Sequence, residues 1–139
     1  MSITPKGIII HSMAEFINTE KGPQKASDFI KSINLSVHGY IHPDGTYESH
    51  IKSPQKAFHA GKSQFQNLSN LNNHFLGIEI LLPGNHDYSS FSKGIQQEGA
   101  YTQESINTAI EVCKYWIEKY KIPHSSIVRH SDVSGDHIR

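Results

Sequence analysis

The sequence has almost no cysteine. Cys113 is the only one in 139 residues, which excludes an internal disulfide and a cluster of thiolate metal ligands. Cys113 also falls on the apolar positions of a predicted helix, so we expect a buried, unreactive thiol rather than a nucleophile.

An excess of charge of one sign and a long hydrophobic run are missing as well. Thirteen basic and thirteen acidic residues cancel, so no net field favours nucleic acid or an anionic membrane as a partner. No apolar run approaches the roughly 20 residues of a membrane span. The three isoleucines at 8–10 are too short for the core of a signal peptide. We therefore expect synthesis in the cytoplasm, and release or non-standard export to the cell wall stays open.

Histidine, in contrast, occurs ten times, and two copies have similar surroundings. His11 follows the apolar run of a predicted strand at 7–12, and His130 ends a second predicted strand at 126–130. Ligands gather beyond the carboxyl ends of strands in sheets covered by helices, so neighbouring strands would bring both imidazoles to one rim. They would supply two of the three protein ligands of a catalytic zinc. The alternative is that each is an ordinary hydrogen-bonded histidine near a strand end.

The remaining pattern indicates a domain that mixes strands and helices. Apolar spacing predicts two amphipathic helices. The longer one has Thr102 as its N-cap and an apolar stripe that includes Ile106, Ile110 and Cys113. Pro43-Asp44-Gly45 predicts a hairpin turn between two strands. The expected elements are helices at 23–33 and 103–120, strands at 35–42, 46–51 and 77–82, and long loops at 52–76 and 83–100.

Three further residues are candidates for chemistry. Glu79 is an acid within the apolar strand "GIEILL" (77–82). It either points to the solvated face or is partly buried and acts as a general acid or base. In "FHAGKS" (58–63), Phe58 and His59 precede a small, flexible pair. These two residues either line a cleft or anchor the loop to the core.

Taken in order, these segments resemble the zinc-dependent N-acetylmuramoyl-L-alanine amidases of type 2, a family that is itself similar to peptidoglycan recognition proteins. The similarity covers nearly the whole chain, although Phe58 stands where the family usually has tryptophan. The motifs that carry it are "GIIIHS", "SVHGYIHPDGT", "FHAGKS", "NHFLGIEI", "YTQESINTAIEVCKYWIEKYKIP" and "IVRHSDV". The resemblance implies one α/β domain over residues 1–139, with a central mixed β-sheet flanked by helices.

The resemblance also implies a reaction and a site. The reaction is hydrolysis, by a zinc-activated water, of the amide between the lactyl group of N-acetylmuramic acid and the L-alanine of the stem peptide. His11 and His130 match the family's histidine ligands of Zn²⁺, and Glu79 matches the glutamate that assists the attacking water. Phe58 and His59 match a segment that lines the groove for peptidoglycan or a muropeptide.

The family's third ligand is an aspartate or cysteine about eight or more residues beyond the second histidine. This sequence stops nine residues after His130, without an Asp-Pro or Cys-Pro pair. We expect a ligand from a tail beyond Arg139, and the alternatives are Asp136, His137 or an incomplete metal site.

The sequence leaves two other functions open. A non-catalytic module would bind muropeptide in the same groove without cleaving it, and a zinc-free structural domain would keep the two histidines far apart. The sequence does not distinguish an endolysin from an antibacterial effector or a recycling enzyme.

Overall fold

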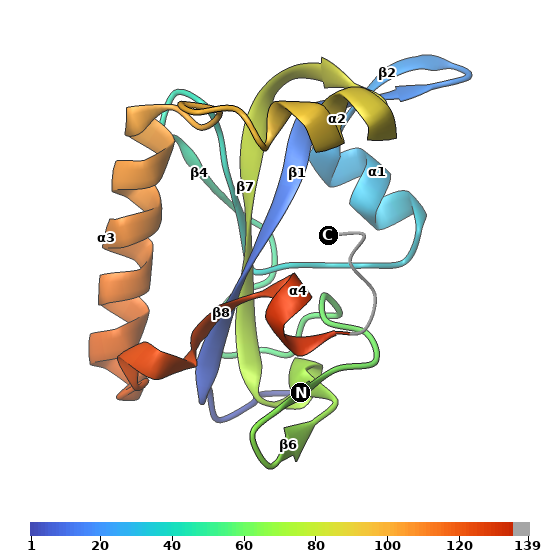
Figure 1. Ribbon diagram of the computed structural model, residues 1–139. Coiled ribbons are helices and arrows are strands. Elements are labelled where there is room, and N and C mark those ends of the chain that lie inside the picture. The colour runs from blue at the N-terminus through green and yellow to red at the C-terminus, as the bar shows by residue number, and fades with distance from the viewer. Residues whose placement is uncertain (135–139) are drawn as a thin grey trace.

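The computed structural model describes residues 1–134, which are built around a six-stranded mixed sheet (Figure 1). The strand order is β2-β1-β7-β3-β4, and β8 pairs with β1 beside β2. Its strands are β1 (Gly7–Thr19), β2 (Gly22–Lys25), β3 (Gly39–Ile41), β4 (Tyr47–Ser49), β7 (Phe75–His86) and β8 (Ile127–Arg129). A separate two-stranded hairpin comprises β5 (Gln64–Phe65) and β6 (Leu68–Ser69).

Within residues 1–134, four α-helices and two short 3-10 helices connect and cover the strands. They are α1 (Ala26–Ser32), α2 (Tyr88–Gly94), α3 (Gln103–Tyr120), α4 (His130–Val133), η1 (Leu71–Asn73) and η2 (His124–Ser126). None of the helices found between residues 1 and 134 has the length and apolar character needed to cross a bilayer. The expected mixed sheet with flanking helices is confirmed.

The strand that contains His11 is longer than predicted. We expected it to end just after His11, but β1 continues to Thr19. Its polar second half is stabilised on both edges, by parallel pairing with β7 and by antiparallel pairing with β2. A shift of register between Ala14 and Phe16 interrupts the pairing with β7. Because β1 continues past His11, this residue lies within the strand and not at its end. The apolar content of the local sequence did not reveal the strands that pair with the second half of β1.

The predicted helix at 23–33 begins later than expected. Residues 22–25 form β2 instead, because Gly22 has a positive φ of 101° and allows a tight reversal after Thr19. The hydroxyl of Thr19 donates a hydrogen bond of 2.7 Å to the carbonyl of Gly22 across this turn. Helix α1 then starts at Ala26.

The two faces of the sheet carry different elements (Figure 1). Helix α3 covers one face, where Ala109, Cys113 and Trp116 pack against strand residues that include Ile8 and Ile78. The prediction that Ile106 and Ile110 belong to the buried stripe of this helix was wrong, since their side chains are 38% and 48% exposed. Helices α1 and α4 lie on the opposite side of the sheet in this view. Two further apolar clusters are present there, one with Ile9 and Phe75 and one with Tyr40 and Leu81.

Both predicted long loops contain regular structure. The segment 52–76 includes β5, β6 and η1, and the segment 83–100 includes α2. Asp87 caps α2 by accepting a hydrogen bond of 2.8 Å from the backbone N–H of Ser90. These elements are too short for a periodic apolar pattern to predict them.

Candidate active site

Three adjacent strands place His11, Glu79 and Tyr40 side by side. His11 of β1 pairs in parallel register with Glu79 of β7, and Glu79 pairs in the same way with Tyr40 of β3. Strands lie about 4.7–4.9 Å apart and side chains in register share a face, so these three form a row across the sheet. All three are buried, with 1%, 0% and 2% of their surface exposed.

His130 joins the row from the other edge of β1. Arg129 pairs with Ile10 in parallel, so His130 follows at the level of His11. The strand ends there because Asp132 accepts a hydrogen bond of 2.9 Å from the backbone N–H of Arg129, at the start of α4. The ring centroids of His11 and His130 are 4.9 Å apart, with an interplanar angle of 61°.

A backbone contact determines which nitrogen of His130 can act as a ligand. Its Nε2 lies 3.1 Å from the carbonyl oxygen of Ala60. A carbonyl only accepts, so Nε2 carries the hydrogen and a neutral ring has its lone pair on Nδ1. The Nδ1 atom is buried and has no hydrogen-bond partner among residues 1–134. Metal-binding histidines usually donate their other ring N–H in this way.

His59 contacts the other histidine of the pair. Its Nδ1 lies 3.0 Å from Nε2 of His11, and its Nε2 lies 3.0 Å from the carbonyl oxygen of Phe75. The imidazoles of His11 and His59 are nearly perpendicular, with an interplanar angle of 87°. His59 therefore connects His11 to the backbone at the start of β7.

The two predicted groove residues occupy different environments. Phe58 is 52% exposed, whereas His59 is 1% exposed. The ring of Phe58 is accessible to solvent. The two ring nitrogens of the buried His59 face His11 and the backbone carbonyl of Phe75.

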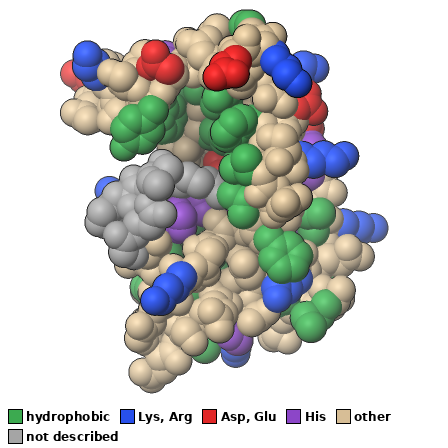
Figure 2. All heavy atoms as spheres, turned by 90° about the vertical axis from the view of Figure 1, so that its right-hand side faces the viewer, with side chains coloured by type: hydrophobic (Ala, Val, Ile, Leu, Met, Phe, Trp, Pro, Cys, Tyr) green, Lys and Arg blue, Asp and Glu red, His purple; other side chains and the backbone are tan. Residues whose placement is uncertain are grey.

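A hollow of about 460 Å³ continues along the face that carries the row. Tyr40 and Leu81 line it, together with His42, Glu48 and His50 at the β3–β4 hairpin. Figure 2 views the molecule from the side of α1 and α4, where hydrophobic side chains gather. The volume is typical of sites for small ligands.

The carboxylate of Glu48 is held at the rim of this hollow by two imidazoles. Its oxygens lie 2.7 Å from Nε2 of His42 and 2.5 Å from Nε2 of His50. Partial burial raises the pKa of Glu48, but the hydrogen bonds from His50 and His42 outweigh it, so the pKa is lowered overall. The hollow therefore has a charged rim beside its apolar lining.

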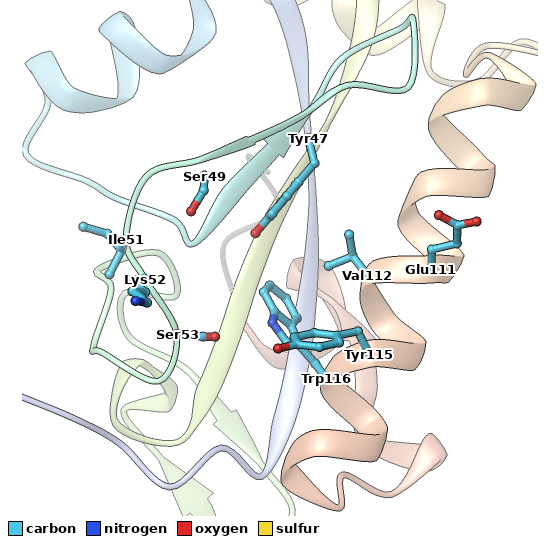
Figure 3. A pocket seen from close by; sticks show the side chains of 9 residues that line it. All are labelled: Tyr47, Ser49, Ile51, Lys52, Ser53, Glu111, Val112, Tyr115 and Trp116. Carbon is cyan, nitrogen blue, oxygen red and sulfur yellow. The ribbon is translucent and has the colours of Figure 1, made fainter.

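A second cavity, of about 320 Å³, lies on the other side of the sheet (Figure 3). Tyr47, Tyr115 and Trp116 line it, between β4 and α3. It contains none of the residues of the His11–Glu79 row. This cavity is therefore separate from the candidate active site.

Comparison with known proteins identifies the family of this chain. The family model described as N-acetylmuramoyl-L-alanine amidase matches residues 1–138. The chain belongs to this amidase family. The expected hydrolase, acting on the amide bond of peptidoglycan, is thereby confirmed.

Solved structures support the amidase fold. A selenomethionine derivative of AmpD has a TM-score of 0.69 at 20% identity, covering 96% of this chain and 75% of that one. The amidase LysC from Clostridium intestinale gives 0.64 at 20% identity over 96% and 75% of the two chains. AmiD from E. coli, in complex with an anhydro-muropeptide substrate, gives 0.61 at 19% identity over 93% and 50%. No curated protein sequence matches the chain.

Amidases of this family are generally zinc-dependent, and the row supplies two suitable donors. Zn–N bonds of about 2.0–2.1 Å in tetrahedral geometry place two imidazole centroids roughly 5 Å apart, close to the 4.9 Å between His11 and His130. No group of three or more potential ligands is found within residues 1–134. The predicted alternatives Asp136 and His137, and any ligand beyond Arg139, lie outside the described residues.

Sequence reasoning missed two supporting residues of this amidase. Asn72 accepts hydrogen bonds from the backbone N–H groups of His59 and Ala60, at 2.9 and 2.8 Å. Tyr40 extends the row beyond Glu79. Strand alternation alone does not show which residues share a face with Tyr40, whereas the pairing of β3 with β7 does.

Proposed function

We propose that this protein is a zinc amidase in which His11 and His130 hold the metal and Glu79 transfers protons. The observation that carries the proposal is the row itself. Two imidazoles lie 4.9 Å apart, and a fully buried carboxylate is in register beside one of them.

The available ligand atoms suit a zinc ion. Neutral imidazole is a common zinc ligand, and the Nδ1 of His130 is buried without a hydrogen-bond partner among residues 1–134. A bound zinc supplies an activated water at neutral pH and polarises the carbonyl of the scissile amide.

Glu79 is assigned two proton transfers in the amide hydrolysis. It accepts a proton from the attacking water, and it then donates this proton to the nitrogen of L-alanine, which must be protonated before it leaves. The C–N bond of the amide breaks, and a lactyl carboxylate and a free stem peptide are formed.

The hollow beside the row is the proposed binding site for the muropeptide. It is lined by Tyr40 and Leu81, which share a face with Glu79. Phe58 is the exposed apolar residue predicted to contact the substrate, and its side chain is accessible. Two similar proteins support this assignment, since AmpDh3 from Pseudomonas aeruginosa was solved with an anhydromuramic pentapeptide and AmiD from E. coli with an anhydro-muropeptide.

Release of free stem peptide from muropeptides tests the proposal. We expect the full-length, zinc-loaded protein to release the peptide. Glu79→Gln, which keeps the shape of the side chain, should lower the rate by about 10²–10⁴-fold. Glu111→Gln is a matched control, because Glu111 is exposed on α3 and lines the separate cavity. A chelator should abolish the activity and added Zn²⁺ should restore it. Absence of peptide release by the zinc-loaded wild type would refute the catalytic assignment.

A non-catalytic muropeptide-binding module is the second candidate. The absence of a three-ligand group within residues 1–134 favours it. Binding of muropeptide with a zinc content near zero would support this alternative.

A further inference from the structure

We propose that His59 is a positioning residue that holds His11 with its Nδ1 presented to the metal. The inference deepens the proposed function, because it concerns how one of the assigned zinc ligands is held. The contacts that carry it join three groups in sequence: the carbonyl of Phe75, the ring of His59 and the ring of His11.

The Phe75 carbonyl determines which nitrogen carries the hydrogen at each step of this series of contacts. The Phe75 carbonyl can only accept, so Nε2 of His59, 3.0 Å away, must be the donor. A neutral His59 then has its lone pair on Nδ1. This atom lies 3.0 Å from Nε2 of His11, which must therefore carry the hydrogen. His11 is left with its lone pair on Nδ1, the form required of a ligand.

The same arrangement argues against His59 as a zinc ligand itself. Its Nε2 is directed to a carbonyl and its Nδ1 to His11. Neither nitrogen can bind a metal while both contacts persist.

The surroundings of His59 fix its ring in place. The ring lies against the backbone of β7 at Gly77, where an added Cβ would collide with the imidazole. The backbone N–H groups of His59 and Ala60 both donate to the side-chain oxygen of Asn72. Burial of all but 1% of His59 excludes competing water.

One short segment thus supports both histidines of the site. The ring of His59 contacts His11, and the carbonyl of the next residue, Ala60, accepts from His130 at 3.1 Å. Outer partners of this kind commonly change metal affinity by about 10–100-fold when they are removed.

The first test measures Zn²⁺ affinity by competition with a chromophoric chelator. His59→Phe removes the acceptor but keeps a flat ring, and we expect affinity to fall by about 10–100-fold. His59→Asn places an amide oxygen near the position of Nδ1 and should recover most of the loss. Equal affinity of His59→Phe and wild type, or no recovery in His59→Asn, would overturn the proposal.

The second test uses the metal-free wild-type protein and therefore requires neither a metal nor a substituted variant. Long-range ¹H–¹⁵N NMR correlations of the metal-free wild type report which nitrogen of His11 carries hydrogen. We expect the Nε2–H form, and an Nδ1–H form would refute the proposal. Because this readout is independent of zinc, failure of the wild type to bind zinc would count against the proposed function and leave the positioning role to be decided by the spectrum.

Discussion

Individual residues of the active site are polar side chains buried on a face of the sheet that also carries apolar residues such as Ile9, Phe75 and Leu81. His11, Glu79 and His59 are at most 1% exposed. A buried polar group is costly unless it has partners, and the hydrogen bonds of His59 show how the cost is offset. The residue types at His11, Glu79 and His130 were recognisable from the sequence, because each interrupts or follows an apolar run. The hydrogen-bond partners of the imidazole rings were not recognisable from it.

Cys113 provides a prediction at the scale of a single residue. Burial raises the pKa of its thiol to about 11, whereas a free cysteine has a pKa of about 8.5. The thiolate is the reactive form, so labelling by a disulfide reagent at pH 8 should be at least roughly 10²-fold slower in the native protein than in denaturant. Equal rates in the two states would contradict the packing of α3 described above.

At the scale of the element, α3 is the part of the fold that the sequence predicted most accurately. Its bounds agree with the prediction, and Thr102 caps it by accepting a hydrogen bond of 3.1 Å from the N–H of Ser105. The Pro43-Asp44-Gly45 turn is also confirmed, with Gly45 at a φ of 91°. Both signals are local, because a cap and a tight turn depend on residues within a few positions of each other.

Thr102 also connects these two elements. Its hydroxyl donates a hydrogen bond of 2.5 Å to the carbonyl of Pro43. We expect Thr102→Ala to lower the free energy of unfolding by about 1–2 kcal/mol, because both the cap and this bond are lost. Thr102→Ser keeps the hydroxyl and serves as the control in urea titrations. A loss in Thr102→Ser as large as that in Thr102→Ala would show that the methyl group, rather than the hydrogen bonds, is responsible.

At the scale of the whole molecule, the two faces of the sheet have different roles. Helix α3 covers one face with an apolar core, and the opposite face carries the row of His11, Glu79 and Tyr40. His38 links distant parts of this framework. Its Nδ1 accepts from the N–H of Gly77 at 3.0 Å, and its Nε2 donates to the carbonyl of Gln55 at 2.7 Å.

His38 gives the global stability a predictable dependence on pH. Burial lowers its pKa below 6.5 in the folded state, despite opposing hydrogen bonds to Gln55 and Gly77. The unfolded chain therefore binds more protons as the pH falls below about 6.5, and the stability contributed by neutral His38 at higher pH is lost.

This dependence can be isolated with one variant. His38→Asn cannot titrate and keeps an acceptor near Nδ1, so its free energy of unfolding should fall less steeply between pH 7.5 and 5.5 than that of wild type. The difference in slope is limited to about 1.4 kcal/mol per pH unit for one proton. Urea titrations at several pH values measure it, and the other histidines cancel in the comparison. Identical slopes would contradict a buried, neutral His38.

The sequence by itself determined the buried strands, the long capped helix, the hairpin turn and the residue types that mark an amidase. These features depend on local spacing of apolar and turn-forming residues. Tertiary structure alone decided that β1 extends past His11, that His11 and His130 meet across 119 positions, and that His59 supports one of them. Such contacts arise from strand order and register, in which the pairing partners are separated by most of the chain and leave no local pattern to be read.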